Sequence, residues 1–303
     1  MAERESVWIP GGTFVMGSNK FYPEERPAHE VIVEGFWMDV HPVTVGDFRR
    51  FVEATGYVTV AERAPNAMDY PGVDPSQLVP GSLVFHRPPQ RVPLTDPRRW
   101  WRYVAGACWH RPEGPGSSVE ERDRHPVTHV AFEDANAFAH WAGKSLPTEV
   151  EWERAARGGL EGATYVWGNE LTPHGRIMAN TWQGEFPWQN LATDGFEGTS
   201  PVGSFPPNGY GLFDMAGNVW EWTCDRFTAD HLPAKRCCSP SGRRPDDAAI
   251  PRRVVKGGSH LCAPNYCLRY RPAARQGESV DTSTCHIGFR CIVRTHQIAN
   301  ERQ

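Results

Sequence analysis

The sequence predicts an α+β fold with little regular secondary structure, and three observations support this prediction. Of 303 residues, 29 are Gly and 27 are Pro, which is too many helix breakers for a helical bundle or a coiled coil. The apolar runs that suggest strands are short, and few segments show a helical pattern. The 12 Trp, 14 Phe and 8 Tyr nevertheless supply enough large side chains for a sizeable core. Short strands, few helices and long ordered loops are therefore expected.

Three helices are predicted from apolar spacing and end signals. The first follows Thr44, an N-cap with an acid three residues later, and ends at Gly56. The second begins at the Thr148–Glu151 capping box, in which each side chain binds the other residue's backbone, and ends at Gly158. A weaker helical pattern covers residues 133–141.

The remaining chain is predicted to consist of short strands and loops in one domain, residues 1–303. No repeat or linker divides it, and polar turn clusters occur along its whole length. Two segments, 71–97 and 239–251, are interpreted as loop insertions, and a polar tail is expected from about residue 295. The strand candidates are residues 8–9, 14–16, 31–33, 36–38, 127–130, 254–255 and 289–293.

Charge and hydropathy exclude several classes of partner. The net charge is −4 and the isoelectric point is about 6.3, so no global positive field attracts nucleic acid or an anionic membrane. No apolar run approaches the roughly 18 residues that a membrane span needs. The polar first residues do not resemble a signal peptide, so the expected compartment is the cytoplasm. A monomer is the default expectation for the oligomeric state.

Two of the eight cysteines, Cys262 and Cys267, stand five residues apart with Pro264 between them. This spacing is too long for a Cys-x-x-Cys redox motif, but it allows the sulfurs to converge across a turn. A structural disulfide, two buried thiols, a metal site and a redox pair all remain open. Two thiolates would favour Cu(I) among common ions, and the nearby Arg269, Arg271 and Arg275 would favour thiolate over thiol.

Two oxygen-rich clusters are candidate cation sites. Asn180 and Thr181 form one with residues 193–196, and residues 214–221 form the other. Each combines a carboxylate with a glycine-bearing turn that can aim backbone carbonyls inward, and such hard ligands favour Ca²⁺. The alternative is that these acids are ordinary solvated turn residues.

Several separated motifs resemble those of the formylglycine-generating enzymes, the sulfatase-modifying factors. The narrowest is Gly257-Gly258-Ser259 followed by the two cysteines and Arg269-Tyr270-Arg271. Wider motifs of the superfamily, in the family's order, occupy residues 9–18, 146–153, 180–187, 208–212, 217–222 and 288–291. The resemblance implies a variant of the C-type lectin fold, low in regular structure.

The same resemblance implies an activity and a set of site residues. Members of the family oxidise a cysteine in a Cys-x-Pro-x-Arg segment of an unfolded sulfatase to Cα-formylglycine, using O₂, a thiol or other reductant and Cu(I). The matching copper ligands are Cys262 and Cys267, and Ser259 matches a serine of the active-site pocket. Trp220 and Tyr266 are candidates for lining the pocket and binding substrate, although packing in the core would explain them equally well.

The family's two calcium sites match the oxygen-rich clusters. The residues are Asn180, the Thr181 carbonyl, Asp194 and the Phe196 carbonyl for one site, and Asp214, the Gly217 and Val219 carbonyls and Glu221 for the other. Two rival functions remain. One is a non-catalytic lectin-like peptide-binding module on the same scaffold. The other is an iron-dependent sulfoxide synthase, which would carry an additional N-terminal helical domain.

Overall fold

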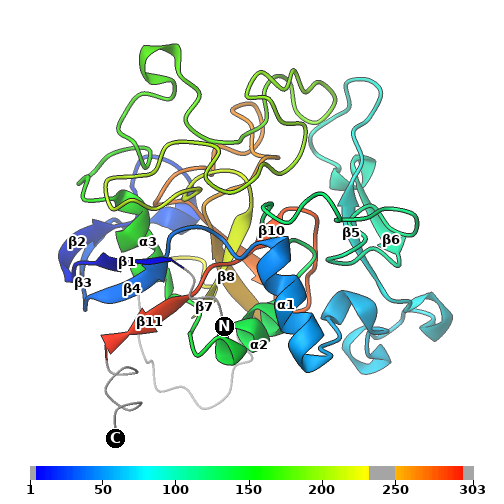
Figure 1. The fold of residues 1–303 in the computed structure, drawn as a ribbon. Coiled ribbons are helices and arrows are strands. Elements are labelled where there is room, and N and C mark those ends of the chain that lie inside the picture. The colour runs from blue at the N-terminus through cyan, green and yellow to red at the C-terminus, as the bar shows by residue number, and fades with distance from the viewer. Residues whose placement is uncertain (1–4, 232–249, 296–303) are drawn as a thin grey trace, which may run out of the picture.

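Small antiparallel sheets form the framework of the protein (Figure 1). The computed structural model describes residues 5–231 and 250–295, so the predicted tail, Cys237, Cys238 and nearly all of the second insertion lie outside the described residues. One sheet has the order β1 (Ser6–Ile9), β4 (Phe36–Asp39), β11 (Ile292–Arg294). A second has the order β10 (Ile287–Gly288), β7 (Trp220–Arg226), β8 (Arg252–Lys256), β9 (Arg275–Ser279), with β10 parallel to β7. Two further pairs are β2 (Gly12–Met16) with β3 (His29–Val33), and β5 (Gly81–Phe85) with β6 (Trp101–Ala105).

All three predicted helices are confirmed as α1 (Val45–Thr55), α2 (Phe132–Trp141) and α3 (Glu149–Arg157). Thr44 and Asp47 exchange side-chain-to-backbone bonds of 3.1 Å at the start of α1. The same reciprocal capping joins Thr148 and Glu151 before α3. Gly56 adopts a left-handed conformation that ends α1. Short 3-10 turns span Pro23–Glu25, Val60–Glu62, Ala67–Asp69, Pro75–Gln77, Pro97–Arg99 and Pro173–Gly175.

Some strand predictions were wrong. Residues 127–130 are irregular, with His129 at a φ of 58°, and they bond singly to distant backbone groups such as Val43 and Thr284. This segment is buried on every side, and burial alone produced the apolar run that suggested a strand. Of the predicted strand 289–293, only residues 292–293 lie in a strand, β11, and residues 289–291 connect β10 to β11. The predicted insertion 71–97 contains β5, and β6, β7 and β9 were not predicted.

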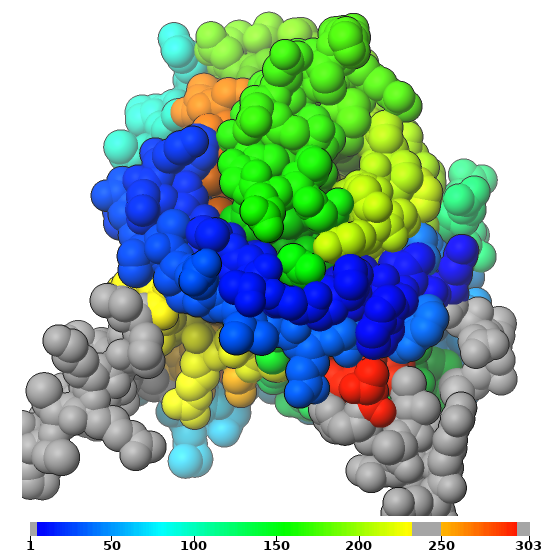
Figure 2. All heavy atoms as spheres, turned by 90° about the vertical axis from the view of Figure 1, so that its left-hand side faces the viewer, coloured from blue at the N-terminus to red at the C-terminus, as the bar shows by residue number. Residues whose placement is uncertain are grey.

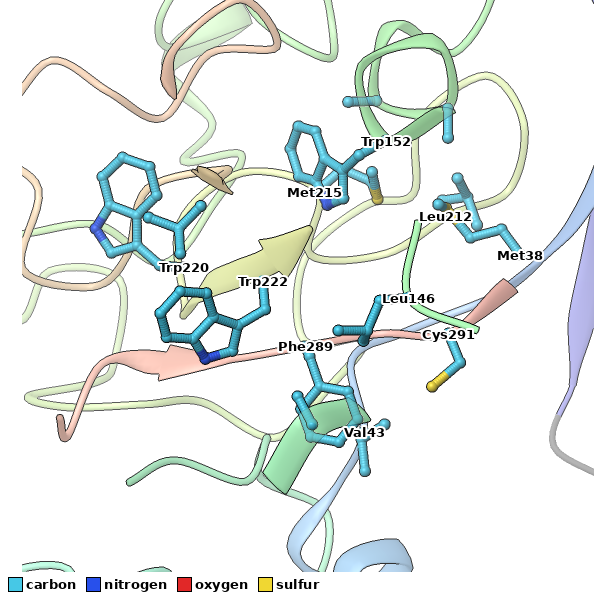
Figure 3. Close-up of a cluster of buried hydrophobic side chains, with 14 of the residues drawn as sticks. Met38, Val43, Leu146, Trp152, Leu212, Met215, Trp220, Trp222, Phe289 and Cys291 are labelled. Atoms are coloured by element: carbon cyan, nitrogen blue, oxygen red, sulfur yellow. The ribbon is translucent and has the colours of Figure 1, made fainter. Parts of the chain in front are cut away.

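The main core lies between α3, β7 and the segment after β10 (Figure 3). Trp152, Trp222 and Phe289 are fully buried there. Figure 2 shows the N-terminal segment, in blue, as an exposed band across this face of the molecule, directly below the green part of the chain that includes α3. The long loops gather at the top of Figure 1, above the framework of sheets and helices.

A separate aromatic cluster fills the loop region. Its buried members are Trp100, Trp182, Phe186, Leu261 and Ala263. Phe85 and Trp101 pack against it from β5 and the start of β6. Within residues 5–231 and 250–295, none of the helices has the length and apolar character needed to cross a bilayer.

Candidate active site

The sulfur atoms of Cys262 and Cys267 lie 2.9 Å apart on one turn. The turn is closed by its own backbone, because the amides of Tyr266 and Cys267 both donate to the Ala263 carbonyl, at 3.0 and 2.7 Å. Only 2% of Cys262 and 8% of Cys267 is exposed to solvent. The sequence left the direction of the two side chains open, and the structure brings the sulfurs together in a nearly dry position.

Close backbone contacts fix the segment that carries this turn. Gly258 has a φ of 69°, and a β-carbon there would lie 2.9 Å from the Tyr270 amide nitrogen, so only glycine fits. The Cys262 carbonyl accepts a bond of 3.0 Å from the Trp182 amide. Asn265 donates from its side chain to the Phe186 carbonyl at 3.2 Å. The turn is therefore attached to the aromatic cluster of the loop region.

The two sulfurs differ electrostatically. A hydrogen bond from the Cys262 thiol, together with the positive charge of Arg269, lowers the pKa of Cys267. Burial raises the pKa of Cys262 well above that of an ordinary thiol. Arg269 is itself held by Glu24 at 2.6 Å and lies over the Tyr22 ring, 3.8 Å from its centroid. Cys267 is therefore the sulfur of the pair that loses its proton more readily.

Ser259 lies beside the sulfur pair and is fully buried. Its backbone amide donates to the Cys262 sulfur at 3.5 Å, and its hydroxyl oxygen accepts a bond of 3.2 Å from the Leu261 amide. Both bonds support the start of the turn. The residue is thus placed for a structural role in shaping the site, and its role in the pocket stays a prediction.

The two aromatic residues predicted to bind substrate lie in different environments. Tyr266 is 38% exposed and stacks on Phe186 with ring centroids 4.5 Å apart. Trp220 is only 2% exposed and packs in the main core, where Figure 3 shows it near Trp222. The structure therefore places Tyr266 at the surface near the sulfurs. Trp220 lies in the core, as expected if it packs there and does not line the pocket.

In the first oxygen-rich cluster, a buried carboxylate oxygen lacks a partner. Asp194 Oδ1 accepts a bond of 3.1 Å from the Phe196 amide, but its Oδ2 is buried without a hydrogen bond. Burial raises the pKa of Asp194. The Thr181 carbonyl accepts from the Gln183 side chain at 2.9 Å, and the Asn180 carbonyl from the Asn218 amide at 2.8 Å. An unpaired buried carboxylate oxygen is what a bound cation would satisfy.

The second cluster is already satisfied by the protein. Glu221 accepts bonds of 2.7 and 2.8 Å from the Arg290 guanidinium and one of 2.8 Å from the Trp152 indole. Asp214 accepts from the Gly203 amide at 2.8 Å, and burial raises its pKa to about 6. These two carboxylates do not fit the predicted cation site well, because each is held by groups of the chain itself.

An open pocket of about 550 Å³ borders the cysteine segment and was not predicted. His260 and Leu261 line it from the residues just before Cys262, and Trp182 lines it from the aromatic cluster. The His260 ring nitrogen Nδ1 donates to the Asn218 carbonyl at 2.8 Å, and burial lowers the pKa of His260 to about 4. The pocket is assembled from loops distant in sequence, so no local pattern indicates it.

Comparison with known proteins identifies the family. A family model described as the sulfatase-modifying factor enzyme 1-like domain matches residues 1–295. The chain belongs to this family. It is 54% identical to the formylglycine-generating enzyme of Mycobacterium tuberculosis over 95% of this chain and 97% of that protein. It is also 39% identical, over 94% of this chain and 84% of that protein, to a mouse relative named inactive C-alpha-formylglycine-generating enzyme 2.

The fold expected for the sulfatase-modifying factor family is confirmed by a solved structure. The structure of PvdO from Pseudomonas aeruginosa matches with a TM-score of 0.64, covering 96% of this chain and 94% of that one. Its sequence is only 24% identical, so this likeness concerns the fold alone. The family contains relatives named as enzymes and relatives named as inactive, so the function has to be argued from the site.

Proposed function

We propose that this protein oxidises a cysteine in a sulfatase segment to Cα-formylglycine, with O₂ as the oxidant. The observation that carries the proposal is the pair of buried sulfurs, Cys262 and Cys267, held 2.9 Å apart. The relatives named as formylglycine-generating enzymes support this reaction and its sulfatase substrate. The free, adjacent sulfurs favour an enzyme over the lectin-like binding module, which needs no such pair.

The donor atoms of the pair fit Cu(I). Two thiolate sulfurs form a soft ligand set, which Cu(I) prefers, whereas Zn²⁺ usually takes four ligands. Among the described residues, no third His, Cys, Asp or Glu joins these sulfurs in a group of potential ligands. Cys262 and Cys267 would hold the ion, and bound copper would supply the one-electron chemistry that O₂ requires.

The chain's own residues would prepare this site in three ways. The hydrogen bond from Cys262 and the charge of Arg269 lower the pKa of Cys267, so this sulfur would give up its proton to a metal more readily. Backbone groups of Ser259 and Ala263 fix the turn through hydrogen bonds, which keeps the two sulfurs close together. The buried aromatic cluster on one side of the turn excludes water from the sulfurs.

The overall reaction balances with an external reductant. The side chain of the substrate cysteine (–CH₂–SH), one O₂, two electrons and two protons give an aldehyde (–CHO), one hydrogen sulfide and one water. The carbon is oxidised through a thioaldehyde, whose hydrolysis releases the sulfur as hydrogen sulfide. A thiol reductant would supply the two electrons, since the site offers only the two ligand sulfurs. The pocket beside His260 and Leu261, next to the cysteine turn in the sequence, would receive part of an extended Cys-x-Pro-x-Arg segment.

The same proposal includes a structural Ca²⁺ at the first oxygen-rich cluster. The unpaired Oδ2 of Asp194 supports it, and Asn180 with the Thr181 and Phe196 carbonyls would complete the ligands. The ion would connect two loop segments that lie beside the aromatic cluster. We derive no corresponding role for Asp214 and Glu221, because both carboxylates are engaged within the protein.

The decisive experiment uses the purified protein loaded with Cu(I) and a peptide that contains Cys-Thr-Pro-Ser-Arg. Under air and a thiol reductant, mass spectrometry should show conversion of the cysteine side chain to the aldehyde, and a hydrazide reagent should trap the product. An anaerobic sample and a peptide with Ser in place of Cys are the controls. Binding of the peptide without aldehyde formation would contradict the proposal and support the binding module.

A further inference from the structure

A second sulfur-containing cluster lies in the hairpin that follows β6. The backbone groups of Cys108 and Arg111 exchange hydrogen bonds of 3.1 and 3.0 Å, which closes the hairpin. Trp109, at its tip, packs against Phe48 of α1 with ring centroids 5.4 Å apart. This anchoring places the Cys108 sulfur 3.4 Å from Nδ1 of His110. The cysteine and the histidine are thus fixed side by side by the hairpin itself.

Glu62 approaches the same two side chains from the 3-10 turn Val60–Glu62, which follows α1. Its Oε2 accepts bonds from the Thr59 amide at 3.0 Å and from the Thr59 hydroxyl at 2.7 Å. Its other oxygen, Oε1, lies 3.7 Å from Nδ1 of His110. One carboxylate oxygen therefore fixes the side chain, and the other faces the cysteine and histidine.

We propose that Glu62, Cys108 and His110 form a binding site for Zn²⁺, separate from the sulfur pair. Their ligand atoms all lie within 4.8 Å of one another. Zinc bonds of about 2.0 Å to nitrogen and oxygen and about 2.3 Å to sulfur place tetrahedral ligands roughly 3.3 Å apart for a nitrogen–oxygen pair and roughly 3.5 Å apart for a sulfur–nitrogen pair. The observed 3.4 Å between the Cys108 sulfur and His110 matches the second value, and the 3.7 Å between Glu62 and His110 needs to close by about 0.4 Å.

The chemistry of the three ligands selects the metal. One sulfur, one imidazole nitrogen and one carboxylate oxygen suit a borderline divalent ion, whereas Ca²⁺ prefers oxygen alone and Cu(I) prefers sulfur. Cys108 is buried, while the side chains of His110 and Glu62 are partly exposed, so water can reach the fourth position. Cys108 would bind as the thiolate and release its proton to solvent.

Such an ion would act as a cross-link. It would join the hairpin after β6 to the turn after α1, two segments that are distant in sequence. The site involves no residue of the proposed active site, so its existence does not depend on the proposed function. We therefore expect zinc to stabilise the fold without taking part in turnover.

The test uses a host protein that lacks the sulfur pair and the two cysteines outside the described residues, so that none of these four sulfurs can bind the added metal. Serine replaces four cysteines in this host, namely Cys237, Cys238, Cys262 and Cys267. Titration with Co²⁺ should give one bound ion per chain and a sulfur-to-cobalt charge-transfer band. Zn²⁺ should displace it and raise Tm by about 4 °C when free zinc exceeds Kd about a hundredfold.

Substitutions in the host then assign the ligands. Cys108→Ser should abolish the charge-transfer band, and His110→Gln and Glu62→Gln should each weaken cobalt binding about tenfold or more. Cys224→Ser, at a half-buried thiol elsewhere, is the matched control and should change neither binding nor spectrum. Near-ultraviolet circular dichroism reports folding, and His110→Gln decides the result if Cys108→Ser does not fold.

Two results would overturn the zinc site. The first is a host protein that takes up no Co²⁺ or Zn²⁺, which would leave Cys108 and His110 as a simple thiol–imidazole hydrogen bond. The second is a charge-transfer band that survives both Cys108→Ser and His110→Gln, since the sulfur ligand would then lie elsewhere.

Discussion

The framework around α3 and the loops around the sulfur pair treat buried polar atoms differently. In the framework, Glu153 pairs with Lys256 at 2.9 Å and Glu221 pairs with Arg290 at 2.7 Å. In the loops, Asp194 has a buried carboxylate oxygen without a hydrogen bond, and two buried sulfurs lie 2.9 Å apart. Charged groups that are fully paired stabilise the fold, whereas buried polar atoms that lack a partner mark places where a ligand can bind.

The largest effect that this contrast predicts is on activity. Cys262→Ser should lower aldehyde formation about a thousandfold or more, because a hydroxyl cannot replace the thiolate as a ligand for soft copper. The unfolding transition should move little, since the turn is closed by backbone bonds. Peptide turnover and urea unfolding measure the two properties separately.

Cys291→Ala is the matched control for this variant. Cys291 is buried in the main core and is no part of the sulfur pair, so its truncation should reduce stability and leave turnover per folded molecule unchanged. Wild-type turnover in Cys262→Ser would contradict the assignment of the sulfurs.

The next largest effect concerns a buried ion pair of the framework. Arg290→Met should lower the free energy of unfolding by about 3–5 kcal/mol, because Glu221 would stay buried without its charge partner. Urea denaturation measures the loss. Arg98→Met is the control, because Arg98 is 90% exposed and its solvent-screened pair with Asp96 should contribute little to stability. Equal losses in the two variants would remove the contrast between buried and exposed pairs.

Calcium should have a smaller effect, confined to the loops. Excess Ca²⁺ should raise the free energy of unfolding by about 2.7 kcal/mol at a hundredfold excess over Kd, and a chelator should reverse this. Asp194→Asn should abolish the calcium-dependent part, because it removes the anionic oxygen. Asp74→Asn is a matched control, since Asp74 makes the same bond to the amide two residues later but is exposed. An unchanged calcium response in Asp194→Asn would place the ion elsewhere.

The smallest effect concerns Asp134, a framework carboxylate that burial leaves with a pKa of about 6. Its ordinary pKa is 3.8, so the folded state binds the proton more tightly than the unfolded chain. The resulting stability is fully present below about pH 4 and is lost as the pH rises through 6, a change on the order of 2 kcal/mol. Asp134→Asn should flatten this part of the stability curve, measured by urea unfolding between pH 4 and 7. If wild type and variant show the same pH dependence of the free energy of unfolding, this dependence arises from other groups.

Features encoded by neighbouring residues could be predicted from the sequence. The capping boxes at Thr44 and Thr148 gave correct helix starts, and the Cys262 and Cys267 spacing allowed the convergence that the structure shows. Features that depend on distant segments could not be predicted. The pairing of β5 with β6 and the approach of Glu62 to Cys108 each join parts of the chain that are far apart in sequence.

Trp220 shows a further limit of sequence reasoning. An aromatic residue has the same identity whether it lines a cleft or fills a core, and only the packing around β7 places it in the core. The free oxygen of Asp194 and the engaged oxygens of Glu221 are a similar case. Both acids stand close to a glycine in the sequence, but their neighbours in space decide which of them has a lone pair to offer.

The closure of the cysteine turn by its own backbone has a consequence for how the family could evolve. Because local backbone bonds close the turn, a few codon changes within one short stretch can create or erase the pair while the scaffold persists. Proteins with and without the two sulfurs can then share the same architecture.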